Sequence, residues 1–205
     1  MNFLAHALLA GELETDRIGG VFGDFVKGLL PAGLPEPLAS GVALHRAIDS
    51  FAESHPAFMR SRARISTERR RVGGVLVDLF YDHLLANRWE HYASLPLPAF
   101  AEGIYRSFDT YLPMLPAGAT VVAERMRAYD WLTAYREISA TGQAIDRMAV
   151  HRLRRPNTLG GGIAELVANA AGFSEDFEAF FADAIVFAAD WRQRRSTAIA
   201  TAQRD

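Results

Sequence analysis

The stretch DLFYDHLLANRW, residues 78–89, places two carboxylates and an imidazole among large apolar side chains. An unpaired charge is costly to bury, so buried acids are usually paired or bound to a metal ion. In a helix, Asp78 and Asp82 share one face, and His83 lies about 100° from Asp82, at its flank. The pattern predicts either a metal site or two acids paired with arginines beside a solvated His83.

A second segment, GVALHRAIDSF at 41–51, also reads as a helix that carries polar groups. His45 and Asp49 lie one turn apart on one face, with Arg46 beside them. Such a pair is either a simple helical ion pair or part of a metal site, where a carboxylate often orients an imidazole ligand.

Two shorter stretches offer further ligand types. In GDFVKG, residues 23–28, Asp24 follows a glycine, and a small residue there lets another group approach closely. In NFLAH, His6 stands among leucines. The structural alternatives are an Asp24 paired with Lys27 or an arginine, and a core histidine. If the four segments converge, their oxygen and imidazole ligands suit Mn²⁺, Fe²⁺, Mg²⁺ or Zn²⁺.

The bulk composition is that of a globular chain. Of the 205 residues, 50% are hydrophobic and 22% are charged, and there is no cysteine. We expect a single domain, residues 1–205, in a reducing, cytoplasmic setting. A formal net charge of −2 gives no whole-protein reason to expect nucleic-acid binding. The apolar N-terminus lacks the basic region of a signal peptide and meets acids too early to span a membrane.

Helical patterns run through almost the whole sequence, and no alternating strand pattern or hairpin signal is present. The fold class predicted is all-α, a helical bundle. A long helix that begins near Ser66 or Thr67 should carry residues 78–89. The other helices are expected at 2–10, 17–29, 37–54, 56–64, 98–111, 118–128, 130–154, 160–171 and 174–200.

Five stretches in this order resemble one family. They are MNFLAH at the start, GDFVKG at 23–28, LHRAID at 44–49, RRVGGVLVDLFYDHLLANRW at 70–89 and WLTAYR at 131–136. The family is that of the bacterial acyl carrier protein phosphodiesterases, also called acyl carrier protein hydrolases. The resemblance implies a helical fold related to the HD metal-dependent phosphohydrolases, and a divalent metal, typically Mn²⁺. The implied reaction is hydrolysis of the phosphodiester between 4′-phosphopantetheine and a serine of holo-acyl carrier protein.

The resemblance implies a role for each of the candidate polar residues. The expected metal ligands are Asp24, His45, Asp82 and His83. Three residues are expected to assist catalysis: Asp78 by completing or orienting the metal shell, Asp49 by orienting His45 or moving a proton, and Arg46 by stabilising phosphoryl charge. His6 is a reserve ligand or supports one. The HD superfamily has a His-Asp doublet, whereas the doublet here is the reversed Asp82-His83.

The substrate that the resemblance implies is a small acidic protein, so a basic surface is expected to bind it. The richest basic run, RSRARISTERRR at 60–71, includes Arg69, Arg70 and Arg71 and precedes the helix of residues 78–89. Lys27 is a further candidate. A second run contains Arg152, Arg154 and Arg155. Either run could instead be a solvated charged face.

Other functions stay open at this stage. The metal site could serve a nucleotide or another small phosphodiester. A non-catalytic module that binds a carrier protein would keep the basic surface with a degenerate metal site. A helical domain whose acids are all paired structurally would need Asp82 for stability even without a metal.

Overall fold

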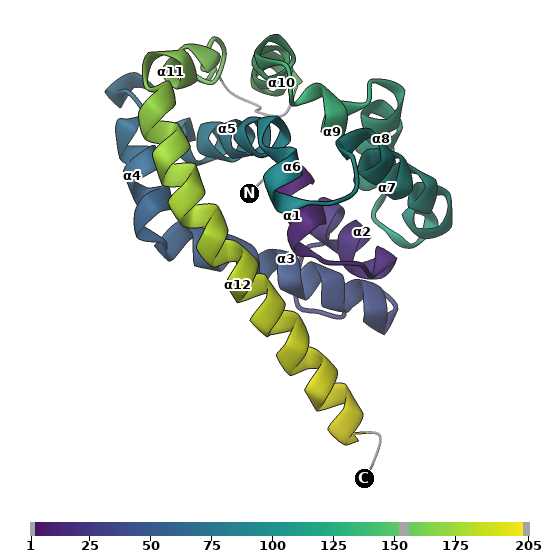
Figure 1. Cartoon of the computed structure of the whole chain (residues 1–205). Helices are drawn as coiled ribbons and strands as arrows, with labels where there is room; N and C mark the ends of the chain where they lie inside the picture. Colours follow the sequence, from purple (N-terminus) through teal and green to yellow (C-terminus); the bar gives the residue numbers. More distant parts are fainter. Residues whose placement is uncertain (1–2, 152–155, 203–205) are drawn as a thin grey trace.

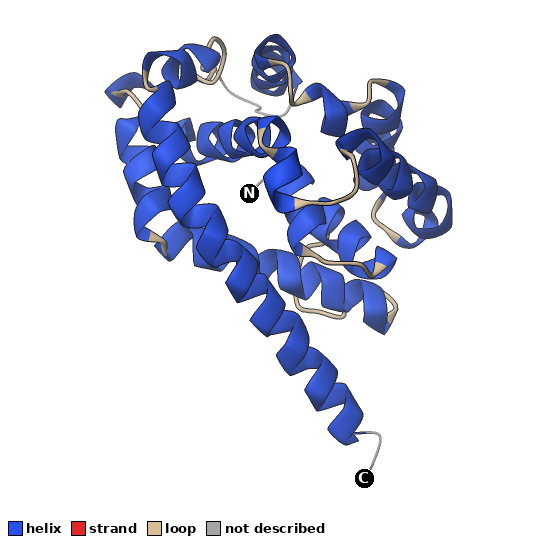
Figure 2. Ribbon diagram, in the orientation of Figure 1, coloured by secondary structure: helices blue, strands red, loops and turns tan. Residues whose placement is uncertain are grey.

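The computed structural model describes residues 3–151 and 156–202, and within these ranges the chain is helical with no strand (Figures 1 and 2). The all-α prediction is confirmed. The predicted basic residues Arg152, Arg154 and Arg155 lie outside the described residues. None of the described helices is both long enough and apolar enough to cross a membrane.

The first half of the chain forms the helices that carry most of the candidate residues. They are α1 (Phe3–Leu9), α2 (Glu14–Phe22), the 3₁₀ turn η1 (Gly23–Phe25), α3 (Glu36–Ser54), α4 (Pro56–Arg64), the 3₁₀ turn η2 (Thr67–Val72) and α5 (Gly73–Asn87). Pro37 and Pro56 lie in the first turns of α3 and α4, where a missing N–H costs no hydrogen bond.

The second half supplies the remaining helices. They are α6 (Trp89–Tyr92), α7 (Leu97–Tyr111), η3 (Leu112–Met114), α8 (Ala117–Ala128), α9 (Trp131–Ala134), α10 (Ile138–His151), α11 (Ile163–Ala168) and α12 (Ala170–Ala202). The helix expected at 130–154 is split into α9 and α10. The start also differs: Asp130 has a φ of 42°, a left-handed conformation that no helix interior adopts, so α9 begins at Trp131.

Two other boundaries differ from the pattern. The helix expected at 17–29 changes to a 3₁₀ turn at Gly23, and Gly28 then adopts a φ of 83°. The long helix expected from Ser66 or Thr67 begins with the 3₁₀ turn η2 and becomes α-helical at Gly73. Gly23 and Gly73 themselves have right-handed helical dihedrals, whereas the positive φ of Gly28 is one that glycine adopts readily and that ends the helical path.

Helix α12 runs along one side of the molecule. Its 33 residues extend from α11 past α3 in Figure 1. Four phenylalanines near its start, Phe173, Phe177, Phe180 and Phe181, are fully buried. Toward its end, the two terminal guanidinium nitrogens of Arg195 each lie 2.7 Å from a carboxylate oxygen of buried Asp16 on α2. The helix therefore ties the core to the α2–α3 pair.

Helices α2 and α3 cross at two glycines. A Cβ on Gly19 would lie 2.5 Å from the carbonyl carbon of Gly41, and one on Gly41 would lie 2.6 Å from the oxygen of Thr15. Both distances are shorter than any side chain tolerates, so the helices approach backbone to backbone. This crossing fixes where α3 presents His45 and Asp49.

Candidate metal centre

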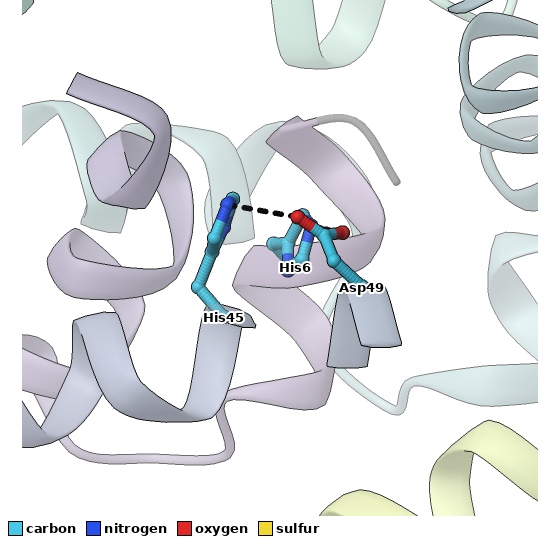
Figure 3. A group of neighbouring side chains, drawn as sticks. All are labelled: His6, His45 and Asp49. Carbon is cyan, nitrogen blue, oxygen red and sulfur yellow. Dashed lines mark hydrogen bonds and ion pairs between the residues drawn. The ribbon is translucent and has the colours of Figure 1, made fainter. Parts of the chain in front are cut away.

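Three polar side chains converge where α1 meets α3. His6, His45 and Asp49 each offer a ligand atom, and these atoms lie within 4.8 Å of one another. Figure 3 shows His6 coming from α1 and the other two from α3, one turn apart. Both imidazoles are buried, whereas Asp49 is partly exposed. We call these three residues the His-His-Asp cluster.

The orientation of His45 is set by the backbone of α2. Its Nδ1 lies 2.7 Å from the carbonyl oxygen of Gly20, and a carbonyl only accepts, so Nδ1 carries the proton. Nε2 then faces Asp49 Oδ2 at 3.1 Å and Asp24 Oδ1 at 3.8 Å. Burial opposes the charged imidazolium, but hydrogen bonds to Asp24 and Asp49 raise the pKa of His45 to about 9. Nε2 is thus placed to bear either a proton or a metal ion.

His6 has the opposite electrostatic character. Burial, followed by the neighbouring charge of His45, lowers the pKa of His6 to about 3, so the ring is neutral at physiological pH. The two imidazoles stack with ring centroids 4.0 Å apart. His6 Nε2 lies 3.0 Å from Asp49 Oδ1, so the carboxylate links both rings. Burial acts against ionisation of Asp49, yet hydrogen bonds from His45 and His6 lower its pKa and keep it charged.

Asp24 closes the cluster on its solvent side, from η1. A Cβ on the preceding Gly23 would lie 2.4 Å from Cγ of His45, so the glycine lets the imidazole pack against the backbone. The sequence predicted such a close approach at this position, and the structure confirms it. Asp24 is 57% exposed and lines an open pocket of about 360 Å³, together with Lys27, Arg46 and the cluster residues His45 and Asp49.

Arg46 lines the same pocket but is already engaged. Its NH1 donates to the carbonyl oxygen of Gly28 at 2.9 Å, and its NH2 donates to that of Val26 at 2.8 Å. These bonds hold the segment after η1 against α3. The residue therefore shapes the wall of the pocket, and its predicted contact with phosphoryl oxygens stays a prediction.

The carboxylate of Asp82 accepts hydrogen bonds from the start of α1. Its Oδ2 accepts from the N–H of Leu4 and its Oδ1 from that of Ala5, both at 2.9 Å. Burial raises the pKa of Asp82 to about 7, although these two bonds favour the carboxylate. The first N–H groups of a helix have no partner within the helix, so Asp82 satisfies two of them and fixes the position of α1. The structure thus places this predicted ligand in support of His6 and outside the His-His-Asp cluster.

His83 also lies outside the cluster. Its Nδ1 donates to the carbonyl oxygen of Tyr135 at 2.8 Å, and Asn87 contacts the same ring. Asp78, one turn before Asp82, is partly exposed, but its Oδ1 is shielded from solvent. Burial raises the pKa of Asp78, and the charges of Asp49 and Asp24 act in the same direction. Asp78 is therefore close enough to the cluster to interact with both acids.

The predicted carrier-binding arginines lie elsewhere. Arg69 donates to Glu165 and to the carbonyl oxygen of Gly160, both at 3.3 Å, beside α11. Arg70 and Arg71 are exposed. In Figure 1, α11 lies at the top, whereas α2 and α3 lie below the centre. Lys27, by contrast, lines the pocket next to the cluster.

From the sequence, His6 was expected to be a reserve ligand or to support one, and Asp49 to orient His45 or move a proton. The one-turn spacing of His45 and Asp49 was a signal for that pair. No spacing could connect His6 to them, since α1 and α3 are brought together by the tertiary fold alone.

Comparisons with known proteins agree on one family. The family model described as acyl carrier protein phosphodiesterase matches residues 1–184. An acyl carrier protein phosphodiesterase from Serratia proteamaculans is 32% identical over 183 residues, covering 88% of this chain and 94% of that protein. One from Pectobacterium atrosepticum is 31% identical over 153 residues, covering 74% and 79%. No solved structure matches the chain.

Proposed function

Because the chain belongs to the acyl carrier protein phosphodiesterase family, we propose that it hydrolyses the phosphodiester between 4′-phosphopantetheine and a serine of holo-acyl carrier protein. The hydroxyl group of a water molecule bonds to phosphorus while the bond between phosphorus and the serine oxygen breaks. The other hydrogen of that water ends on the serine oxygen. The products are apo-acyl carrier protein and 4′-phosphopantetheine. The observation that carries this proposal is the His-His-Asp cluster beside an open pocket.

We further propose that the cluster holds a divalent metal ion, with Asp24 as an additional ligand. The fit rests on His45, because two carboxylates face its Nε2, which carries a lone pair in the neutral tautomer. Such an arrangement calls for a positive charge between the groups. Mixed nitrogen and oxygen ligands suit Mn²⁺, with Mg²⁺, Fe²⁺ and Zn²⁺ as alternatives. When bound, the ion would lower the pKa of a coordinated water toward neutrality.

The residues of the chain then have separate tasks. The carbonyl oxygen of Gly20 holds His45 in the tautomer that presents Nε2. Asp82 fixes α1 and so keeps His6 in place. Lys27, exposed on the pocket wall, can balance charge on the phosphoryl oxygens. Asp78 is retained as a candidate positioning residue because it lies within electrostatic range of Asp24 and Asp49.

The proposal is tested with purified protein, holo-acyl carrier protein and Mn²⁺, with and without a chelator. Intact mass spectrometry follows the carrier protein. We expect a metal-dependent loss of the phosphopantetheine mass with the wild type and with His83→Ala, and no loss with His45→Ala. An unchanged carrier protein in the presence of metal-loaded wild type would exclude this reaction. Model phosphodiesters and nucleotides assayed in parallel would then identify the substrate class.

A further inference from the structure

A second and larger pocket lies among α1, α5 and the helices α8 to α10. Its volume is about 590 Å³, and much of its wall is aromatic or aliphatic. The residues that form this wall include Phe3, Phe25, Leu79, Trp131, Tyr135 and Met148. We call it the aromatic pocket. Pockets of this size and character typically enclose small organic ligands.

The aromatic pocket and the His-His-Asp cluster draw residues from the same part of the chain. Phe3 and His6 are three residues apart on α1, hence on neighbouring positions of one helix face. Phe25 directly follows Asp24 in η1, and Leu79 directly follows Asp78 in α5. Three elements that carry polar residues at or near the proposed metal site therefore also supply walls of the aromatic pocket.

The WLTAYR stretch at 131–136 has no part in the chemistry described so far. Two of its residues, Trp131 and Tyr135, line the aromatic pocket. Phe3 belongs to MNFLAH and Phe25 to GDFVKG, two more of the family-like stretches. MNFLAH thus contributes to both the cluster and the aromatic pocket, and GDFVKG supplies Phe25 to the pocket next to Asp24.

Two cations complete the pocket. Arg125 on α8 and Arg147 on α10 both line it and are exposed. Neither forms a salt bridge with any residue in the described ranges. Their N–H donors are available for carbonyl oxygens, while the aromatic wall favours methyl and methylene groups. The combination fits a long, uncharged chain that alternates apolar carbons with amide groups.

We propose that the aromatic pocket binds the pantetheine arm of the substrate while its phosphate lies at the His-His-Asp cluster. The inference rests on the proposed function. The arm consists of a carbon bearing two methyl groups, a secondary hydroxyl, two amides and a thiol, with methylene groups between the amides and before the thiol. It must extend from the phosphorus along the protein surface, and the aromatic pocket offers an apolar path one helical turn from His6.

The proposal is tested by a substitution that fills the aromatic pocket with a large side chain. Ala144 lines it from α10 and is half-buried, so Ala144→Trp places a large ring in the cavity. The matched control is Gln143→Trp, one position earlier on α10, exposed and absent from the pocket wall. Calorimetry then measures binding of 4′-phosphopantetheine and of methyl phosphate, which has no arm, to each metal-loaded protein. Thermal melting checks that both variants fold.

We expect the wild type and Gln143→Trp to bind 4′-phosphopantetheine more tightly than methyl phosphate. In Ala144→Trp the affinity for 4′-phosphopantetheine should fall by roughly tenfold or more, with a parallel loss of kcat/KM on holo-acyl carrier protein. A folded Ala144→Trp that binds 4′-phosphopantetheine like the wild type would overturn the inference. If Ala144→Trp does not fold, Val122→Trp replaces it, since Val122 lines the pocket from α8. Wild-type affinity of folded Val122→Trp for 4′-phosphopantetheine would likewise overturn the inference.

Failure of the proposed function would look different. In that case the wild type itself would leave holo-acyl carrier protein intact. If the wild type cleaves the carrier protein and folded Ala144→Trp cleaves it equally well, the function stands and the aromatic pocket is not the arm site.

Discussion

At the scale of single residues, the tautomer of His45 decides what the cluster can bind. Its Nδ1 is committed to the carbonyl oxygen of Gly20, so its other nitrogen is directed at Asp24 and Asp49. His6 is kept neutral by burial. A neutral ring, a second ring with a fixed tautomer and two carboxylates together form a donor set for a divalent cation.

The two histidines that the sequence placed among the ligands should therefore differ in effect. His45→Ala removes a nitrogen from the cluster, and we expect the purified variant to lose its bound metal. His83→Ala should retain it, since the ring of His83 bonds to the carbonyl oxygen of Tyr135. Metal per chain, measured by inductively coupled plasma mass spectrometry after Mn²⁺ loading, compares the two. Loss of the metal from both variants would restore the ligand set expected from sequence, and the reverse ranking would exclude His45 as a ligand.

Asp82 should matter for folding even without metal. Asp82→Ala leaves the buried N–H groups of Leu4 and Ala5 without their acceptor. We expect the free energy of unfolding to fall by about 2–6 kcal/mol, because each of the two unsatisfied buried donors costs about 1–3 kcal/mol. Urea unfolding of the chelator-treated protein measures this. An unchanged midpoint would show that the carboxylate does not hold α1.

The pKa of Asp82 also gives stability a pH dependence. Its folded pKa of about 7 lies above the ordinary 3.8, so the folded state binds the proton more tightly than the unfolded state does. The resulting stabilisation is complete below pH 3.8 and is lost as the pH rises toward 7. We expect the free energy of unfolding of the wild type to fall relative to that of Asp82→Asn as the pH rises from 3.8 to about 7. A difference that is flat with pH would contradict this assignment.

At the scale of the elements, glycines set the spacing of the helices that carry the cluster. Gly19 and Gly41 let α2 and α3 touch backbone to backbone, and Gly23 lets His45 lie against η1. Since His45 and Asp49 sit on α3, any separation of this helix from α2 moves both ligands away from Gly20 and Asp24. The geometry of the proposed metal site thus depends on residues that have no side chain.

Substitution of one of these glycines should harm both stability and metal binding. In Gly41→Ala the new methyl group would lie 2.6 Å from the oxygen of Thr15, so the helices must move apart. We expect a loss of about 1–3 kcal/mol, the usual cost of overpacking, together with weaker Mn²⁺ binding. The control is Gly74→Ala on α5, where the Cβ meets nothing within 4 Å. That change should be neutral or stabilising, by up to about 1 kcal/mol.

At the scale of the whole molecule, contacts between segments far apart in sequence hold in place the helices that surround the cluster. Asp82 on α5 fixes α1 across 77 and 78 residues, and Arg195 on α12 anchors α2 through Asp16 across 179 residues. A metal ion bound by α1, η1 and α3 would add a further link among them. Ligand binding to the folded state alone stabilises it by mass action.

Metal should accordingly raise the melting temperature of the whole chain. At a free Mn²⁺ concentration about 100 times Kd, stabilisation should reach about 2.7 kcal/mol. Differential scanning calorimetry with increasing Mn²⁺ measures the shift, and His45→Ala should show little of it. Equal shifts in the two proteins would mean that the ion binds elsewhere.

The sequence by itself determined the helical class and the pairing of His45 with Asp49. It also indicated the close approach at Gly23. These features are local: the period of a helix fixes which side chains share a face, and a missing side chain leaves room at its own position. The family-like stretches were also readable at this level, and the comparisons agree with them.

The tertiary structure alone decided the partners of each polar group. It stacks His6 on His45 and directs Asp82 toward the N–H groups of α1. It also places His83 within hydrogen-bonding distance of the carbonyl oxygen of Tyr135. The physical reason is that periodicity fixes the face of one helix but not the helix that packs against it. Each of these contacts spans roughly 40 to 80 residues, so the packing of the core selects them.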